Sequence, residues 1–218
     1  MAINYKLDAY PPHTAVFDIE RGQLADIRSE FWQTDTAVAV NSWGYIKGLE
    51  YKSAASIIGD LADIVSKNGA LLLNIGPRAD GVIPDPDKKI LLEIGQWLAV
   101  NGEAIYGTRP WKVYGEGPTP VMEGAFTDTK RGAYTGADIR FTTRGQTLYA
   151  IGLARPRERK VLIRSLGTAL RLFAGRIADV QLLGSRAPVA WRHTPSGLNV
   201  ILPRIPSGSG VYALKISK

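Results

Sequence analysis

Residues 53–77 read SAASIIGDLADIVSKNGALLLNIGP and decide the fold class of the first half of the chain. Within 53–67, apolar residues recur every three or four positions, which predicts an amphipathic helix with Ser53 as its N-cap. Asn68-Gly69 is typical of the end of a helix. The short apolar run at 70–75 then predicts a strand that is buried on both faces of a parallel sheet.

The same alternation of helix and strand continues on either side of this stretch. A second helix is predicted from Asp85 as N-cap, with Pro86 in its first turn, to Asn101-Gly102, and residues 2–6 predict a short strand. This order favours an α/β layer or barrel. A parallel layer of only two or three strands has exposed edges, so we expect residues 1–112 to be part of something larger.

The second half of the chain, from about Pro110-Trp111, has a different composition and a different hydrophobic pattern. Residues 114–119 are rich in Gly and Pro and are interpreted as a connector. Short alternating segments then follow, separated by Gly, Pro and Ser turns at a spacing typical of an antiparallel β-sandwich. The predicted strands are 138–142, 147–153, 160–163, 179–183, 198–202 and 210–216. We therefore expect an α/β plus all-β protein, with domains at 1–112 and 113–218.

The composition excludes several classes of protein. The 218 residues are 45% hydrophobic and 22% charged, as expected of a soluble globular chain. The absence of cysteine excludes a disulfide scaffold, a thiolate zinc site and a cysteine nucleophile. With only His13 and His193, we expect no metal site and no cofactor. No apolar run approaches the roughly 18 residues of a membrane span, and residues 1–10 lack the features of a signal peptide. These features do not assign the protein to a cellular compartment.

The net charge of +7 is unevenly distributed along the chain. Residues up to Lys112 carry 11 basic and 14 acidic side chains, whereas those from Val113 carry 16 and 6. We interpret the basic half as a solvated, arginine-rich β surface. A nucleic-acid partner is not expected, because no recognition helix or aromatic platform is evident. Residues 76–81 also lack the spacing of a phosphate-binding glycine loop.

Residues 18–45 are interpreted as a long loop with clustered carboxylates, Trp32 and Trp43. Such a loop suits a sugar site, because aromatic faces pack on the ring while carboxylates and amides bind its hydroxyl groups. Glycosidases also need two carboxyl groups beside the bond that is cleaved. The alternative is a surface loop that two tryptophans anchor.

Three motifs carry a resemblance to a known family. NSWGY at 41–45, VSKNGALLLNIGP at 65–77, and NGEAIY at 101–106 with Pro110-Trp111 resemble the α-L-fucosidases of glycoside hydrolase family 29. The resemblance spans about residues 3–112 and is fainter over the tail. It implies the C-terminal part of a (β/α) barrel followed by an antiparallel β-sandwich. It also implies a retaining exo-α-L-fucosidase, acting on a fucosylated oligosaccharide or glycoconjugate.

The resemblance also implies roles for individual residues. Glu20 aligns with the acid/base glutamate of some members, and the alternative is a surface glutamate paired with Arg21 or Arg28. Gln33 lies where other members have a glutamate, but an amide cannot exchange a proton usefully, which favours Glu20.

Three residues are expected to bind substrate. Trp43 matches an aromatic position that packs on the sugar. Lys6 aligns with an arginine near the nucleophile, and lysine keeps its positive charge without the bidentate fork. Trp32 is assigned to the substrate site because it lies in the same tryptophan-bearing segment as Trp43.

The resemblance covers only the C-terminal half of the family, so the nucleophile is expected outside this chain, in a missing N-terminal half that acts as a partner. In a self-sufficient enzyme, Asp18 or Asp35 would have to be the nucleophile. The alternative function is a non-catalytic carbohydrate-binding or assembly module with a basic β domain. A homo-oligomer is left open, and no nucleic-acid or membrane partner is expected.

Overall fold

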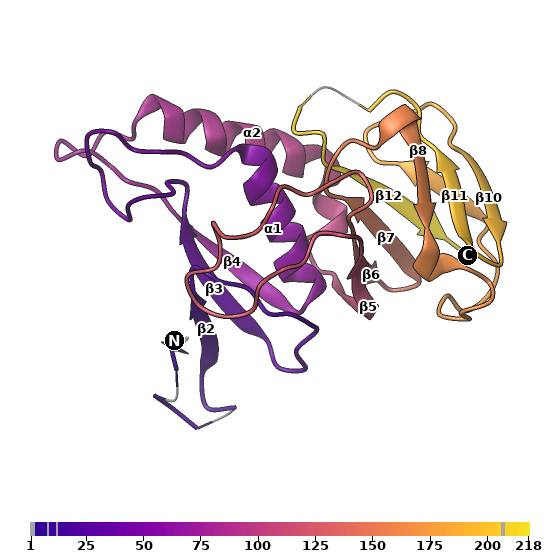
Figure 1. Ribbon diagram of the computed structural model, residues 1–218, viewed down its shortest axis with the longest axis horizontal. Coiled ribbons are helices and arrows are strands. Elements are labelled where there is room, and N and C mark those ends of the chain that lie inside the picture. Colours follow the sequence, from indigo (N-terminus) through magenta and orange to yellow (C-terminus); the bar gives the residue numbers. More distant parts are fainter. Residues whose placement is uncertain (1–2, 8, 12, 206–207) are drawn as a thin grey trace.

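The computed structural model describes residues 3–7, 9–11, 13–205 and 208–218. Its first half contains four strands and two helices (Figure 1). They are β1 (Asn4–Tyr5), β2 (Val16–Glu20), β3 (Trp32–Ala37), α1 (Ala54–Ser66), β4 (Gly69–Asn74) and α2 (Asp85–Asn101), followed by the 3-10 helix η1 (Gly102–Ala104). The strand predicted at 2–6 is present at 4–5, and its first residue lies outside the described part of the chain.

The four strands form one parallel sheet in the order β1-β2-β3-β4. The prediction of a long loop over 18–45 was therefore wrong, because most of β2 and all of β3 lie within it. Polar residues alternate there with Ile19 and Trp32, so only one strand face carries large apolar side chains. The polar side chains of the other face gave the segment a loop-like composition, so the strands were not predicted.

Strand β4 differs from the prediction of a strand buried on both faces. Leu72 is 54% exposed, because β4 is an edge strand and α1 packs on one face of the sheet only. The described strands form an open sheet rather than a closed barrel, and β1 and β4 each pair along one side.

Both predicted helices are confirmed, with small shifts at their ends. The Ser53 side chain caps α1 by accepting a hydrogen bond from the Ser56 backbone N–H. Asn68 adopts a left-handed φ of 71° just after the helix, a conformation that asparagine tolerates well. Helix α2 starts at Asp85 as its first residue, with Pro84 rather than Asp85 at the N-cap.

The second half is a sandwich of two antiparallel sheets, as predicted. One sheet has the order β5-β6-β7-β12-β9 and the other β10-β11-β8. The strands are β5 (Arg109–Glu116), β6 (Ile139–Arg144), β7 (Thr147–Gly152), β8 (Lys160–Ile163), β9 (Asp179–Leu182), β10 (Ala190–Thr194), β11 (Gly197–Ile201) and β12 (Tyr212–Ser217). The 3-10 helices η2 (Arg157–Arg159) and η3 (Arg164–Leu166) flank β8. The predicted boundary at residue 112 falls inside β5, which pairs with β6 and so belongs with the sandwich.

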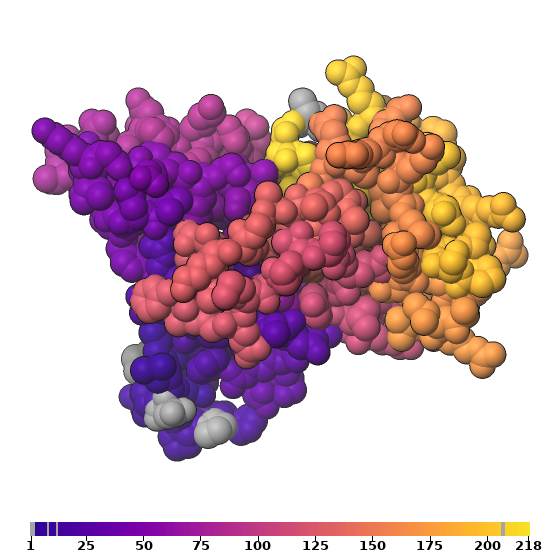
Figure 2. Space-filling model, viewed as in Figure 1, coloured from indigo at the N-terminus to yellow at the C-terminus, as the bar shows by residue number. Residues whose placement is uncertain are grey.

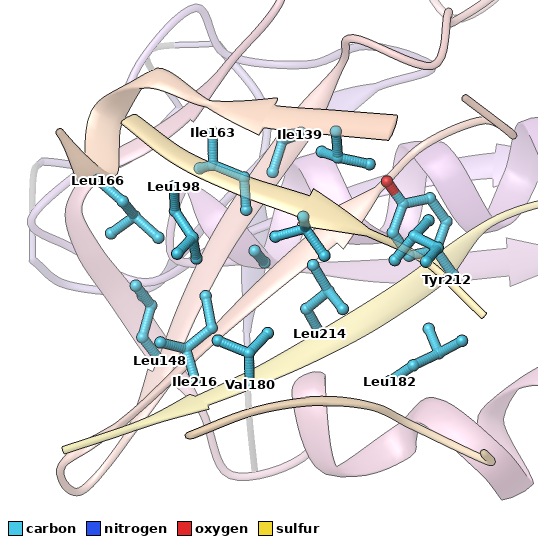
Figure 3. Close-up of a cluster of buried hydrophobic side chains, with 14 of the residues drawn as sticks. Ile139, Leu148, Ile163, Leu166, Val180, Leu182, Leu198, Tyr212, Leu214 and Ile216 are labelled. Carbon is cyan, nitrogen blue, oxygen red and sulfur yellow. The ribbon is translucent and has the colours of Figure 1, made fainter. Parts of the chain in front are cut away.

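Apolar side chains from both sheets fill the interior of the sandwich (Figure 3). Phe141, Ile163, Leu198 and Ile216 are all inaccessible to solvent. Strand alternation places them inward, so this core forms from the period-two pattern that predicted most of the strands.

The two halves share a second apolar core. Helices α1 and α2 pack against Tyr149 and Ile151 of β7, on the outer face of the five-stranded sheet. The indole N–H of Trp97 donates to the backbone carbonyl of Val211 at 2.9 Å. Figure 1 shows α1 between the parallel sheet and the sandwich. The α/β half therefore buries its helices against the β half.

Buried charges reinforce this junction. The Asp63 carboxylate of α1 is fully buried and accepts from Lys67 Nζ at 2.8 Å and from Arg140 Nε of β6. Lys67 is fully buried as well, and it also donates to the Leu24 carbonyl at 2.7 Å. A single carboxylate thus neutralises two cations that connect both halves of the molecule.

Candidate active site

A group of charged side chains lies on the face of the parallel sheet that α1 leaves uncovered. Lys6 follows β1, Glu20 is the last residue of β2, and Asp35 lies directly beside Glu20 in β3. The Lys6 ammonium is 2.8 Å from Asp35 Oδ2, 3.1 Å from Glu20 Oε2 and 3.7 Å from Asp18 Oδ2. We call these four residues the Lys6 cluster.

Strand geometry explains why the cluster forms. Asp18 and Glu20 are two positions apart in β2, so their side chains share a face. Parallel register places Asp18 beside Gln33 and Glu20 beside Asp35. Gln33 Nε2 lies 3.5 Å from Asp18 Oδ1, at the limit of a hydrogen bond. Sequence analysis identified Lys6, Glu20 and the spare carboxylates separately, and the sheet brings them together.

The three carboxylates differ in their access to solvent. The side chain of Asp18 is 6% exposed, that of Asp35 20% and that of Glu20 32%. The suggested pairing of Glu20 with Arg21 or Arg28 does not occur, because those arginines pair with Asp128 and Glu30. Glu20 is therefore the carboxylate that an incoming molecule can reach most easily.

Burial and neighbouring charges shift the pKa values of two members of the cluster, Asp18 and Lys6. Burial raises the pKa of Asp18, and the neighbouring charge of Asp35 raises it further, against the opposing effect of Lys6. Burial acts to lower the pKa of Lys6, but hydrogen bonds to Asp35 and Glu20 raise it overall. The cluster thus holds an ammonium that keeps its proton more firmly than a free lysine, and a carboxyl group that ionises less readily than a free aspartate.

Asp18→Asn should change how stability depends on pH. Because the folded pKa of Asp18 lies above its ordinary value of 3.8, neutral Asp18 favours folding at acidic pH. That contribution is lost as the pH rises from 3.8 through the raised pKa. We expect the free energy of unfolding of Asp18→Asn to increase relative to the wild type across this window, as measured by urea unfolding. A constant or shrinking difference contradicts the assignment.

Trp43 lies in the loop 38–53, which follows β3, and this residue is 36% exposed. The Arg21 guanidinium stacks over its ring at 5.3 Å from the centroid. Asn74, at the end of β4, donates to the Trp43 carbonyl at 2.6 Å. Asn41 closes the same loop through bonds with Gly48 and Glu50. The loop therefore holds Trp43 at the end of the sheet that carries Glu20.

The structure corrects the assignment of Trp32 to the substrate site. Its side chain is 0% exposed, and its indole N–H donates to the Lys67 carbonyl at 2.9 Å. It packs with Ile19 and Ile64 beneath α1, on the face opposite the Lys6 cluster. Alternation along β3 directs Trp32 away from Gln33 and Asp35. Trp32 is a core residue and is not available to a substrate.

A cavity of about 670 Å³ opens beside β2, a volume within the range of small-molecule sites. Lys6, Asp18 and Glu20 border it together with apolar side chains that include Phe17 and Leu24. Residues 123–126 line its other side. Sequence analysis missed this last contribution, because it comes from a segment about 100 positions further along the chain.

Among the described residues, no helix combines the length and apolar composition needed to cross a bilayer. The described part of the chain also holds no group of three or more His, Asp or Glu side chains arranged to bind a metal ion.

Comparison with known proteins agrees with this architecture. The family model "Alpha-L-fucosidase" matches residues 6–103, and "Alpha-L-fucosidase C-terminal domain" matches residues 134–217. The chain therefore belongs to the alpha-L-fucosidase family.

Relatives and solved structures extend the match. The tissue alpha-L-fucosidase of Rattus norvegicus is 30% identical over 219 residues, which cover 97% of this chain and 40% of that protein. A solved alpha-L-fucosidase is 25% identical with a TM-score of 0.77, covering all of this chain and 45% of the other. The Thermotoga maritima alpha-fucosidase, solved in complex with fucose, is 26% identical with a TM-score of 0.71, covering 97% and 44%. The chain thus spans less than half the length of each.

Proposed function

We propose that this chain is the C-terminal part of a retaining exo-α-L-fucosidase, which hydrolyses terminal α-L-fucosyl linkages. The observation that carries the proposal is the Lys6 cluster, with Glu20 at the carboxyl end of β2 on an uncovered sheet face. In barrels of parallel strands, active sites lie at the carboxyl ends of the strands. Membership of the alpha-L-fucosidase family supports the reaction type.

Glu20 is the proposed general acid and base. As a neutral carboxyl group it protonates the glycosidic oxygen while the bond to the sugar breaks. The resulting carboxylate then takes a proton from the water that attacks the covalent sugar–enzyme intermediate. Its partial exposure and its place beside the cavity give it access to both the leaving group and water. Gln33 cannot perform this exchange, because an amide does not titrate in this range.

Lys6 and Trp43 are the proposed substrate-binding residues. Lys6 presents an ammonium between three carboxylates, where it stabilises their charge and can donate to a sugar hydroxyl. The partly exposed ring of Trp43 offers an apolar face to the C–H surface or the methyl group of fucose. The proposed substrate is therefore a fucosylated oligosaccharide or glycoconjugate.

The nucleophile and the remaining barrel strands are proposed to lie in the part of the relatives that this chain does not span. The parallel sheet is open, with β1 and β4 each paired along one side. All-parallel sheets are almost always covered on both faces, whereas the face that carries the Lys6 cluster is uncovered here. An N-terminal half, as part of the same polypeptide or as a partner, would close the barrel around the Lys6 cluster.

The proposal predicts different activities for the 218-residue chain and for the complete enzyme, in which the preceding barrel strands are present. The chain alone should not cleave an aryl α-L-fucoside above background, because it lacks the nucleophile. The complete enzyme should cleave it, and NMR of the first product should show α-L-fucose, the retained anomer. Turnover by the chain alone would transfer the nucleophile role to Asp18 or Asp35, and initial release of the β anomer would exclude retention.

A further inference from the structure

The segment between β5 and β6, residues 117–138, folds back onto the parallel sheet. Figure 2 shows this connecting segment, in salmon, lying across the face of the molecule from the sandwich to the indigo and purple part. One family model ends at residue 103 and the other begins at residue 134, so residues 117–133 of the connecting segment lie outside both. Its contacts with the sheet concentrate on the turn that follows Glu20.

Backbone hydrogen bonds attach the connecting segment to that turn. The Phe126 N–H donates to the Glu20 carbonyl at 2.9 Å. The N–H groups of Thr127 and Asp128 both donate to the Arg21 carbonyl, at 2.8 and 3.0 Å. Gly22 lies so close to the carbonyl of Gly124 that an added Cβ would be 1.9 Å from its oxygen. The backbone on both sides of Glu20's carbonyl is therefore fixed by residues about 100 positions away.

Asp128 is the buried polar anchor of this attachment. Its side chain is 8% exposed, and its Oδ2 accepts from Thr36 Oγ1 at 2.6 Å, Lys52 Nζ at 2.6 Å and Arg21 Nε at 3.1 Å. Burial opposes its ionisation, but the bonds from Lys52 and Thr36 lower the pKa of Asp128 overall. It is thus a carboxylate at neutral pH, and it is the counter-ion of two largely buried cations.

Arg21 connects this anchor to both proposed substrate-facing residues. It directly follows Glu20 and adopts a left-handed φ of 49°, which is unfavourable for a side chain of this size. Its guanidinium donates to the Val40 carbonyl at 2.8 Å and lies over the ring of Trp43. A strained backbone persists only when the surroundings hold it, and Asp128 provides the charged part of that support.

We propose that Asp128 is a positioning residue that sets the orientation of Glu20 through Arg21. This inference rests on the proposed function, in which Glu20 is the acid/base. Without the carboxylate, Arg21 loses its ion pair, the turn relaxes, and the Glu20 carboxyl moves away from the leaving-group oxygen. A displacement of about 1 Å at a reacting group is enough to slow turnover by roughly 100-fold.

The test measures the complete enzyme on two substrates, a nitrophenyl α-L-fucoside and a fucosyl disaccharide. The first has a good leaving group and needs little proton donation, whereas the second needs it fully. Asp128→Asn should lower kcat/KM for the disaccharide by roughly 100-fold and for the nitrophenyl fucoside several-fold at most. Asp128→Glu, which keeps the charge, should recover part of the loss on the disaccharide.

Asp138→Asn is the matched control. Asp138 is a fully buried carboxylate at the other end of the connecting segment, where it accepts from Thr119 and Thr135 and touches neither Arg21 nor Trp43. Its loss should affect both substrates equally. If Asp128→Asn fails to fold, Thr36→Val removes one donor to Asp128 without a change of charge. It should give a smaller effect with the same substrate dependence.

Equal losses on the two substrates in Asp128→Asn, or in Thr36→Val where the first variant does not fold, overturn the inference. Glu20→Ala, measured in parallel, separates this outcome from failure of the proposed function. If the loss of kcat/KM in Glu20→Ala depends on the leaving group and the loss in the Asp128 variant does not, Asp128 is a structural residue only. If Glu20→Ala shows no such dependence, the acid/base assignment itself is wrong.

Discussion

Glu20→Ala in the complete enzyme is expected to lower kcat/KM for a fucosyl disaccharide by about 10²–10⁴-fold, the usual contribution of a general acid. The sugar leaving group then departs without a proton, which costs most for poor leaving groups. A nitrophenyl fucoside should lose much less in its first step. Steady-state kinetics on both substrates measure the difference.

Two variants control this experiment. Glu20→Gln keeps the size of the side chain but cannot exchange a proton, so its loss should match that of Glu20→Ala. Glu30→Ala removes a partly exposed glutamate that pairs with Arg28 and is not a member of the Lys6 cluster, so its activity should stay close to that of the wild type. Unchanged kinetics in both Glu20 variants would remove Glu20 from the mechanism.

Asp63→Ala is expected to reduce the free energy of unfolding by about 3–5 kcal/mol, the usual effect of removing one partner from a buried ion pair. The variant leaves Lys67 and Arg140 buried without their shared carboxylate. Because Arg140 lies in β6 and Asp63 in α1, the loss also loosens the junction between the two halves. Urea unfolding of the 218-residue chain measures the change.

Asp85→Ala is the comparison for this stability measurement. Asp85 is 95% exposed and pairs with Lys88 three residues on, so its loss should change the free energy of unfolding by about 0.5 kcal/mol or less. If Asp63→Ala is no more destabilising than Asp85→Ala, the buried network does not hold the two halves together.

The helices and most sandwich strands could be predicted because their local patterns match their surroundings. Helix α1 has an apolar stripe and a side-chain cap, and β6 and β11 alternate with period two between short turns. Strand β2 was missed because its outward residues form a charged cluster, which gave the segment a loop-like composition. Burial of β4 was overestimated, because apolar composition alone does not tell an edge strand from a central one.

Individual residues of the candidate site could be predicted, whereas contacts between residues that lie far apart in the sequence could not. Composition gave Trp32 and Trp43 equal weight, yet strand parity buries the first and the loop after β3 exposes the second. Glu20 and Lys6 could be identified individually, whereas their 3.1 Å contact depends on the pairing of β1 with β2. Asp128 carries no local signal, because its partners lie 76 to 107 positions away.

Azide rescue of Glu20→Ala tests the central claim most directly. Azide needs no general base, so it should accelerate turnover of a nitrophenyl α-L-fucoside by attacking the sugar–enzyme intermediate. Attack on an intermediate of inverted configuration returns the original anomer, so NMR should identify α-L-fucosyl azide. Formation of the β-azide would instead make Glu20 the nucleophile, and the absence of any fucosyl azide would contradict its role as acid/base.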